Sequence, residues 1–189
     1  MKWITREKIK VDRVACPWLI QHFVDPQAEF LFLPHDTDWS KIDNGAGGSR
    51  ATSTGGSGSR PVRSAVDEPG GDEIKGIVFD VPNCELGHNG EDVSFNSILK
   101  KYRLSDPALV LLGEIVRAAD SRPNNPHPAG EGLRWIARGF SELGLSDHKI
   151  LEREFVVYDA LYQECKLQMT NATRSSGAAS LFEIASIVR

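Results

Sequence analysis

The sequence of 189 residues lacks any long apolar run. No segment approaches the roughly 18 consecutive apolar residues that a transmembrane helix requires. The first twenty residues, MKWITREKIKVDRVACPWLI, contain no apolar stretch of the signal-peptide kind. These absences predict a protein that is neither embedded in a membrane nor exported, and we expect it in the cytoplasm.

Cysteine and basic charge are also scarce. The cysteines, Cys16, Cys84 and Cys165, are odd in number, lie far apart and form no CxxC pair. This pattern is typical of reduced thiols rather than of a disulfide framework. The net charge of −4 argues against nucleic-acid binding by this chain, because such binding needs a basic face.

Large side chains are missing from residues 45–60, GAGGSRATSTGGSGSR, where ten of the sixteen residues are Gly or Ser. Such a segment buries too little apolar surface to offset the entropy that is lost on ordering. The sequence therefore predicts a flexible insert at about 45–71 within a single domain of residues 1–169. A C-terminal tail is predicted at 170–189.

Short apolar runs at 2–6, 28–34 and 74–82 predict strands. One early helix is predicted within 11–26, and helical patterns continue from residue 94 onward. Strands early in the chain and helices late in it favour an α+β fold. We expect a few short N-terminal strands packed against about five helices, with the C-terminal half all-helical.

Capping residues predict where the helices begin. Asp106 and Pro107 are a favourable N-cap and first-position pair for ALVLLGEIVRAAD. Ser94 is the predicted cap of FNSILKKY. In the early helix, Pro17 either takes the first helical position, which makes Cys16 the N-cap, or follows a turn and kinks the helix.

The most unusual stretch is ELGHNGEDVSF, residues 85–95, which combines a histidine with carboxylates in a glycine-hinged loop. The two glycines permit a backbone turn that directs His88 and Glu91 to one point. Imidazole and carboxylate together suit Zn, Mn or Fe, and they equally suit acid–base chemistry. An exposed polar turn is the alternative.

Two ligands do not complete a metal site. Asp12 and Asp120 adjoin apolar helix segments, where an unpaired charge is costly, so they are the predicted further ligands. Their neighbours Arg13 and Arg117 are predicted to bind an oxyanion or to orient the carboxylates. Structural ion pairs are the alternative for both arginines.

Three further residues are candidates for supporting roles. If Cys16 caps a helix that starts at Pro17, the helix dipole and Arg13 would lower the pKa of its thiol and make it reactive. The alternative is a small buried apolar side chain. His148 and Asp159 lie on one side of the last long helix. They are predicted to contact the metal ligands without binding the metal themselves.

Three sequence elements occur in a recognisable order: DRVACPWLI, FDVP followed by ELGHNG, and VYDALY. Together they resemble the C-terminal domain family of the chromate-resistance protein ChrB, over nearly all of the chain except the insert and the tail. The resemblance implies a soluble domain that acts in chromate sensing or response. In longer relatives the domain follows an N-terminal regulatory region, so a stand-alone form is expected here.

Three functions agree with these features. The first is binding of a divalent metal or of an oxyanion such as chromate in a pocket of His, Glu, Asp and Arg residues. The second is a metal- or thiol-dependent redox enzyme that detoxifies chromate or its oxidative by-products. The third is a regulatory partner without an active site. The first is the predicted function, with a small oxyanion rather than a membrane as the expected partner.

Overall fold

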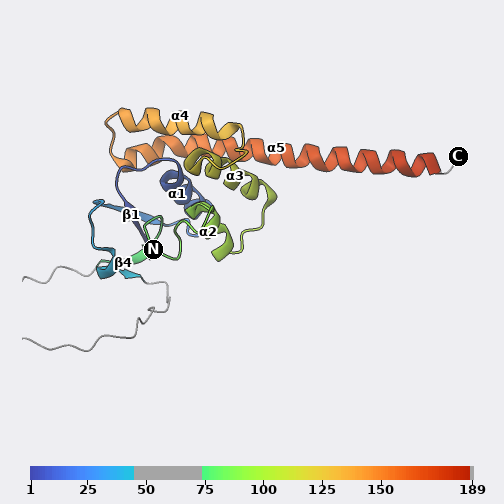
Figure 1. Cartoon of the computed structure of the whole chain (residues 1–189). Helices are drawn as coiled ribbons and strands as arrows, with labels where there is room; N and C mark the ends of the chain where they lie inside the picture. The colour runs from blue at the N-terminus through green and yellow to red at the C-terminus, as the bar shows by residue number, and fades with distance from the viewer. Residues whose placement is uncertain (45–73, 188–189) are drawn as a thin grey trace, which may run out of the picture.

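The computed structural model describes residues 1–44 and 74–187 (Figure 1). Its sheet is built from short parallel strands: β1 (Lys2–Arg6), β2 (Glu29–Leu33), β3 (Asp43–Asn44) and β4 (Lys75–Val78). Their spatial order is β2-β1-β4-β3, so the first strand lies in the interior of the sheet. The predicted strands are confirmed, whereas the insert predicted at 45–71 falls outside the described residues.

The helices follow the order that the sequence predicts. They are α1 (Val11–Phe23), α2 (Ser94–Lys101), α3 (Pro107–Ser121), α4 (Ala129–Glu142) and α5 (Asp147–Ile187), with a short 3-10 helix at Trp39–Lys41. The α1 helix packs on the sheet side of the bundle and contacts α2, α3 and α5. The α+β class and the helical C-terminal half are therefore confirmed.

The start of α1 differs from the prediction. The helix begins at Val11 and runs through Pro17 to Phe23, so Cys16 lies within the helix rather than at its N-cap. Proline lacks an N–H group and leaves one carbonyl without its helical partner. Tertiary packing outweighs this loss, because most residues between Val11 and Ile20 are buried.

The capping predictions have mixed outcomes. The side chain of Asp106 accepts a hydrogen bond from the Ala108 N–H at 2.8 Å and caps α3, as predicted. The predicted cap at Ser94 is wrong, because Val93 is the N-cap residue of α2 and offers no side-chain bond. Asp147 is the first residue of α5, and its carboxylate accepts hydrogen bonds from the backbone N–H groups of Lys8 and Ile9, which precede α1.

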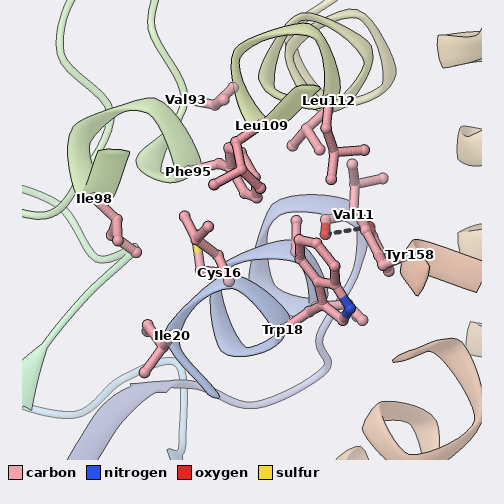
Figure 2. Packing of buried hydrophobic residues seen from close by; sticks show 14 of the residues in the cluster. Val11, Cys16, Trp18, Ile20, Val93, Phe95, Ile98, Leu109, Leu112 and Tyr158 are labelled. Carbon is pink, nitrogen blue, oxygen red and sulfur yellow. Dashed lines mark hydrogen bonds between the residues drawn. The ribbon is translucent and has the colours of Figure 1, made fainter. Parts of the chain in front are cut away.

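The main core lies between the helices and one face of the sheet. Trp18 of α1 is fully buried, and its ring packs in a tilted arrangement against Tyr158 and edge-on against Tyr162 of α5. Figure 2 shows Phe95, Leu109 and Leu112 of the neighbouring helices near Cys16 and Trp18 of α1, together with the 2.8 Å hydrogen bond from the Tyr158 hydroxyl to the Val11 carbonyl oxygen. This bond fixes α5 against the first turn of α1.

The α5 helix continues well past the other helices (Figure 1). Its apolar face follows the helical spacing of its sequence, since Leu151, Tyr158, Tyr162 and Cys165 are buried. The predicted domain limit at residue 169 falls inside this helix. Across the described ranges, no helix is long and apolar enough to cross a membrane.

A core substitution tests this packing. Leu112 is fully buried in α3, whereas Val110 in the same helix is 50% exposed. Leu112→Ala is expected to lower the free energy of unfolding by about 2–5 kcal/mol, because the truncation leaves a cavity. Val110→Ala is the matched control and should stay within about 0.5 kcal/mol of wild type. Urea denaturation measures both, and similar losses would show that α3 is oriented differently.

Candidate functional site

The candidate site lies at the carboxyl edge of the sheet, between β1 and β4. The chain leaves β1 through α1 to β2 on one side, whereas β4 occupies the other side. Ligands of open parallel sheets bind in the crevice at such a switch point. Arg6 ends β1, Asp12 lies in the first turn of α1, and Asp80 follows β4, so polar side chains from three elements meet there.

Asp12 is only 2% exposed and is held by three donors. Its Oδ2 accepts from the Ser94 N–H at 2.7 Å, and its Oδ1 accepts from the Phe95 N–H at 3.1 Å and the Cys16 thiol at 3.3 Å. The carboxylate therefore caps α2 from α1, in place of the side chain that Val93 does not supply. This contact fixes the position of Asp12.

Asp80 has a φ of 47°, in the left-handed region that residues other than glycine rarely adopt. Its Oδ1 accepts a hydrogen bond from the Ser94 hydroxyl at 2.9 Å, and its Oδ2 lies 3.2 Å from Nε of Arg13. Arg6 donates Nε–H to the Asp80 carbonyl oxygen at 3.2 Å. Backbone strain that is held by so many contacts is common at functional sites.

His88 is the centre of the cluster. Its Nε2 lies 3.3 Å from Oδ2 of Asp12, 3.4 Å from Oδ1 of Asp80 and 3.6 Å from Oδ2 of Asp120. Hydrogen bonds to Asp12 and then to Asp80 raise the pKa of His88 to about 10, although partial burial opposes them. The ring is therefore protonated at neutral pH and offsets part of the surrounding negative charge.

Asp120, near the end of α3, completes the group of acids around His88. Burial, followed by the charge of Asp12, raises its pKa to about 6, although His88 opposes this shift. The structure thus brings together three of the predicted ligands, His88, Asp12 and Asp120. Asp80 is a further member that the sequence did not single out.

The spacing of these atoms suits a cation. One donor atom from each of Asp12, Asp80 and His88 lies within 4.8 Å of the others. Two ligands of a tetrahedral ion with bonds of about 2.1 Å are separated by about 3.4 Å. The two shorter His88 contacts have this separation, and the same distances also suit a protonated imidazole that bridges the two carboxylates.

Arginine side chains form one wall of the site. Arg13 donates from Nη1 to the Glu7 carbonyl oxygen at 2.9 Å, and its burial is the main cause that lowers its pKa from the ordinary value. Arg6 faces a neighbouring pocket of about 220 Å³. The lining residues of this pocket are Arg6, Asp80, Val81, Pro82, Asn83 and His88. Arg13 forms an ion pair with Asp80, which agrees both with the predicted orienting role and with the alternative of a structural ion pair.

Two predicted site residues do not join His88. Glu91 is exposed and interacts electrostatically with Arg117. Arg117 forms an ion pair with Glu114 one turn earlier in α3. The loop turns at Gly90, which has a φ of 65°, and this turn separates Glu91 from the inward-facing His88.

His148 and Asp159 also lie away from the cluster. The Nε2 atom of His148 is 3.1 Å from the Phe30 carbonyl oxygen. Asp159 accepts a hydrogen bond from Nε1 of Trp18 at 2.8 Å and lies 3.4 Å from Nε2 of His22. Both residues therefore join α5 to other elements rather than support the candidate ligands.

The predicted reactive thiol is wrong. Cys16 is fully buried, and burial together with the charge of Asp12 places the pKa of its thiol well above the ordinary value. It lies in the middle of α1, so no helix N-terminus stabilises its thiolate. Its contribution is the hydrogen bond to Asp12.

Cys84 is expected to be the accessible thiol. It is partly exposed, whereas Cys16 and Cys165 are buried. A thiol reagent should therefore label one cysteine per native chain promptly, and Cys84→Ser should abolish this fast phase. Cys16→Ser is the control and should retain it. Fast labelling that survives in Cys84→Ser would contradict the burial of the other thiols.

Asp80, Ser94 and Arg6 are the site residues that the sequence analysis missed. A usable signal was present for Asp80, because it follows an apolar strand directly, where parallel strands present their ligands. Ser94 was assigned to a helix cap, but its hydroxyl binds Asp80 instead. Arg6 gives no sequence signal beyond its place at the end of a strand.

The residues of this site all lie in the part of the chain that is similar to known proteins. The family model described as "ChrB, C-terminal domain" matches residues 3–51 and 62–165. Protein ChrB of Cupriavidus metallidurans is 29% identical over 162 residues, which are 85% of this chain but 40% of that relative. No solved structure matches. Because the family model covers most of the chain, the protein belongs to the ChrB C-terminal domain family.

Proposed function

We propose that this domain binds a divalent metal ion through Asp12, Asp80 and His88 and that it acts in chromate sensing or response. The observation that carries the proposal is the position of His88 Nε2, at 3.3 and 3.4 Å from one oxygen of each carboxylate. These separations match those of neighbouring ligands around one small ion, which are about 3.4 Å. Asp120 is the candidate fourth ligand.

The surrounding contacts support this assignment. Ser94 and Arg13 orient Asp80, and the first N–H groups of α2 orient Asp12, as supporting groups do around metal ligands. One imidazole with two or three carboxylates suits Zn, Mn or Fe. A metal binds the neutral imidazole, so it must displace the proton of His88, and affinity is expected to rise with pH.

Binding of an oxyanion such as chromate is the second candidate. Arg6 and the protonated His88 line the same pocket of about 220 Å³, and a planar guanidinium donates readily to such an anion. The carboxylate of Asp80 faces this pocket as well and opposes an anion unless a metal or His88 neutralises it. The oxyanion is therefore the weaker candidate.

A redox enzyme that detoxifies chromate or its by-products is the remaining alternative. The burial of Cys16 and the raised pKa of its thiol disfavour thiol chemistry there. An enzyme of this kind would depend on iron or manganese held by the ligands of the proposed metal site. Turnover of chromate with an added reductant would favour it over simple binding.

The test combines elemental analysis with calorimetric titration of Zn²⁺, Mn²⁺ and Fe²⁺. His88→Ala and Asp80→Asn are each expected to weaken binding by at least about tenfold, because the first removes a ligand and the second removes the negative charge of one. Glu91→Gln is the matched control and should bind as wild type does. Unchanged binding in His88→Ala would overturn the metal site, and chromate binding that is lost in Arg6→Ala would favour the oxyanion.

A further inference from the structure

The α4 helix is apolar on two opposite sides. Leu133 and Ala137 are buried against the rest of the domain. On the outer side, Trp135 is 68% exposed; Ile136 on the flank of the helix is 40% exposed, and Leu143 just after its last residue is 58% exposed. A helix with apolar residues around its circumference is normally covered on both sides, and such exposed patches mark interaction surfaces.

Glycines on the outer side of α4 point to a close neighbour. A Cβ atom added at Gly132 or at Gly139 would meet nothing within 4 Å, whereas one added at Gly130 would lie 2.9 Å from backbone atoms of Ala118 and Ala119. Packing against α3 thus explains Gly130. Glycine weakens a helix by about 1 kcal/mol relative to alanine, and contacts within the described chain do not require it at the other two positions.

The outer side is also hollowed. A pocket of about 450 Å³ is lined by Trp135, Arg138, Gly139 and Glu142. The indole Nε1 of Trp135 donates to Oε1 of Glu131 at 2.7 Å, so the ring leans toward the N-terminus of α4. The Trp135 ring therefore lies beside the pocket on the same surface, shifted toward the N-terminal end of α4.

The charges on this surface complement those of a second copy. Glu131 and Arg138 are two turns apart on the outer side, carry opposite charges and flank Trp135. If two α4 helices pack antiparallel about an axis near Trp135, Glu131 faces Arg138 of the partner subunit, and the same pair repeats at the other end. The indole then leans toward Gly139 of the partner subunit. A surface that complements itself in this way is the signature of a two-fold interface.

We propose that the outer side of α4 is the interface of a homodimer in which two antiparallel α4 helices pack against each other. The Trp135 rings fill the hollows beside the glycines, and two ion pairs set the direction of packing. This proposal is independent of the metal site, because the interface contains none of the candidate ligands.

Sedimentation equilibrium of the full chain tests the dimer. Wild type should show twice the chain mass of 20.8 kDa. Arg138→Glu should raise the dissociation constant of the dimer at least about tenfold, because it places like charges opposite each other twice. The double variant Glu131→Arg/Arg138→Glu should dimerise more tightly than Arg138→Glu, since the two ion pairs re-form with their signs exchanged, although Trp135 loses its acceptor on Glu131.

Leu167→Ser, which removes an exposed apolar side chain of α5, is the matched control and should remain dimeric. Urea denaturation verifies that every variant is folded. A monomeric wild type, a dimer that Arg138→Glu leaves intact or a double variant that dimerises no more tightly than Arg138→Glu would overturn the proposal. Loss of the dimer in Leu167→Ser alone would also overturn it, by placing the interface on α5.

Discussion

Asp12→Ala is expected to lower the free energy of unfolding by about 3–5 kcal/mol and to abolish metal binding at the same time. The carboxylate is buried, accepts two N–H groups at the start of α2 and lies 3.3 Å from the protonated His88. Alanine would leave these donors buried without partners and would remove one charge that holds the imidazolium in place.

Urea denaturation and an NMR titration of His88 measure the two effects. Loss of Asp12 removes the largest cause of the raised His88 pKa, so that value should fall from about 10 toward the ordinary 6.5. Glu91→Ala is the control and should change neither quantity. An Asp12→Ala variant of wild-type stability would show that α2 does not depend on this cap.

The ion pair between His88 and Asp12 also predicts that the protein loses stability at alkaline pH. The pKa of His88 is higher in the folded state, so its stabilising contribution is fully present below pH 6.5 and is lost as the pH rises through about 10. Asp12→Ala should flatten this part of the stability profile. A wild-type profile that is level between these limits would contradict the ion pair between His88 and Asp12.

Glu154→Met is expected to stabilise the protein by about 2–3 kcal/mol at pH 8. Glu154 of α5 is 2% exposed, and both of its carboxylate oxygens are buried without a hydrogen-bond partner among the described residues. Burial raises its pKa from 4.5 to about 7. Above that pH the folded protein must hold an unpaired buried charge, which methionine removes at similar volume.

The raised pKa of Glu154 also predicts how the free energy of unfolding changes with pH. Glu154 ionises more readily in the unfolded chain, so its contribution to wild-type stability should fall between pH 4.5 and about 7 and stay constant above that pH. The difference between Glu154→Met and wild type should grow over the same interval. Glu152→Gln, at an exposed residue of the same helix, is the control and should keep the wild-type profile. A Glu154→Met variant that is less stable at pH 8 would reveal an unseen partner of the carboxylate.

Local patterns were sufficient for much of the fold. The pair Asp106–Pro107 marks the start of α3, and the spacing of Leu151, Tyr158 and Cys165 marks the buried face of α5. These signals depend on neighbours within a few turns, so they hold whatever the rest of the chain does. The order of strands and helices predicted the α+β class for the same reason.

Ligand chemistry also indicated which residues to consider together. His88, Asp12 and Asp120 were grouped because charges beside apolar helices need partners, and the structure places both carboxylates within 3.6 Å of the His88 imidazole. The same reasoning failed for Glu91 and Arg117. Spacing along the chain does not show on which side of Gly90 the loop turns inward.

The sequence by itself determined the element types, the apolar faces and the short list of residues able to hold a cation. Only the tertiary structure decided that Asp80 is a central residue of the cluster and that Cys16 is a buried donor. Asp80 reaches His88 because β4 pairs with β1, and Cys16 is buried because α1 begins at Val11 and packs against α2 and α5. Strand order and helix packing depend on contacts between residues far apart in the chain, which no local pattern encodes.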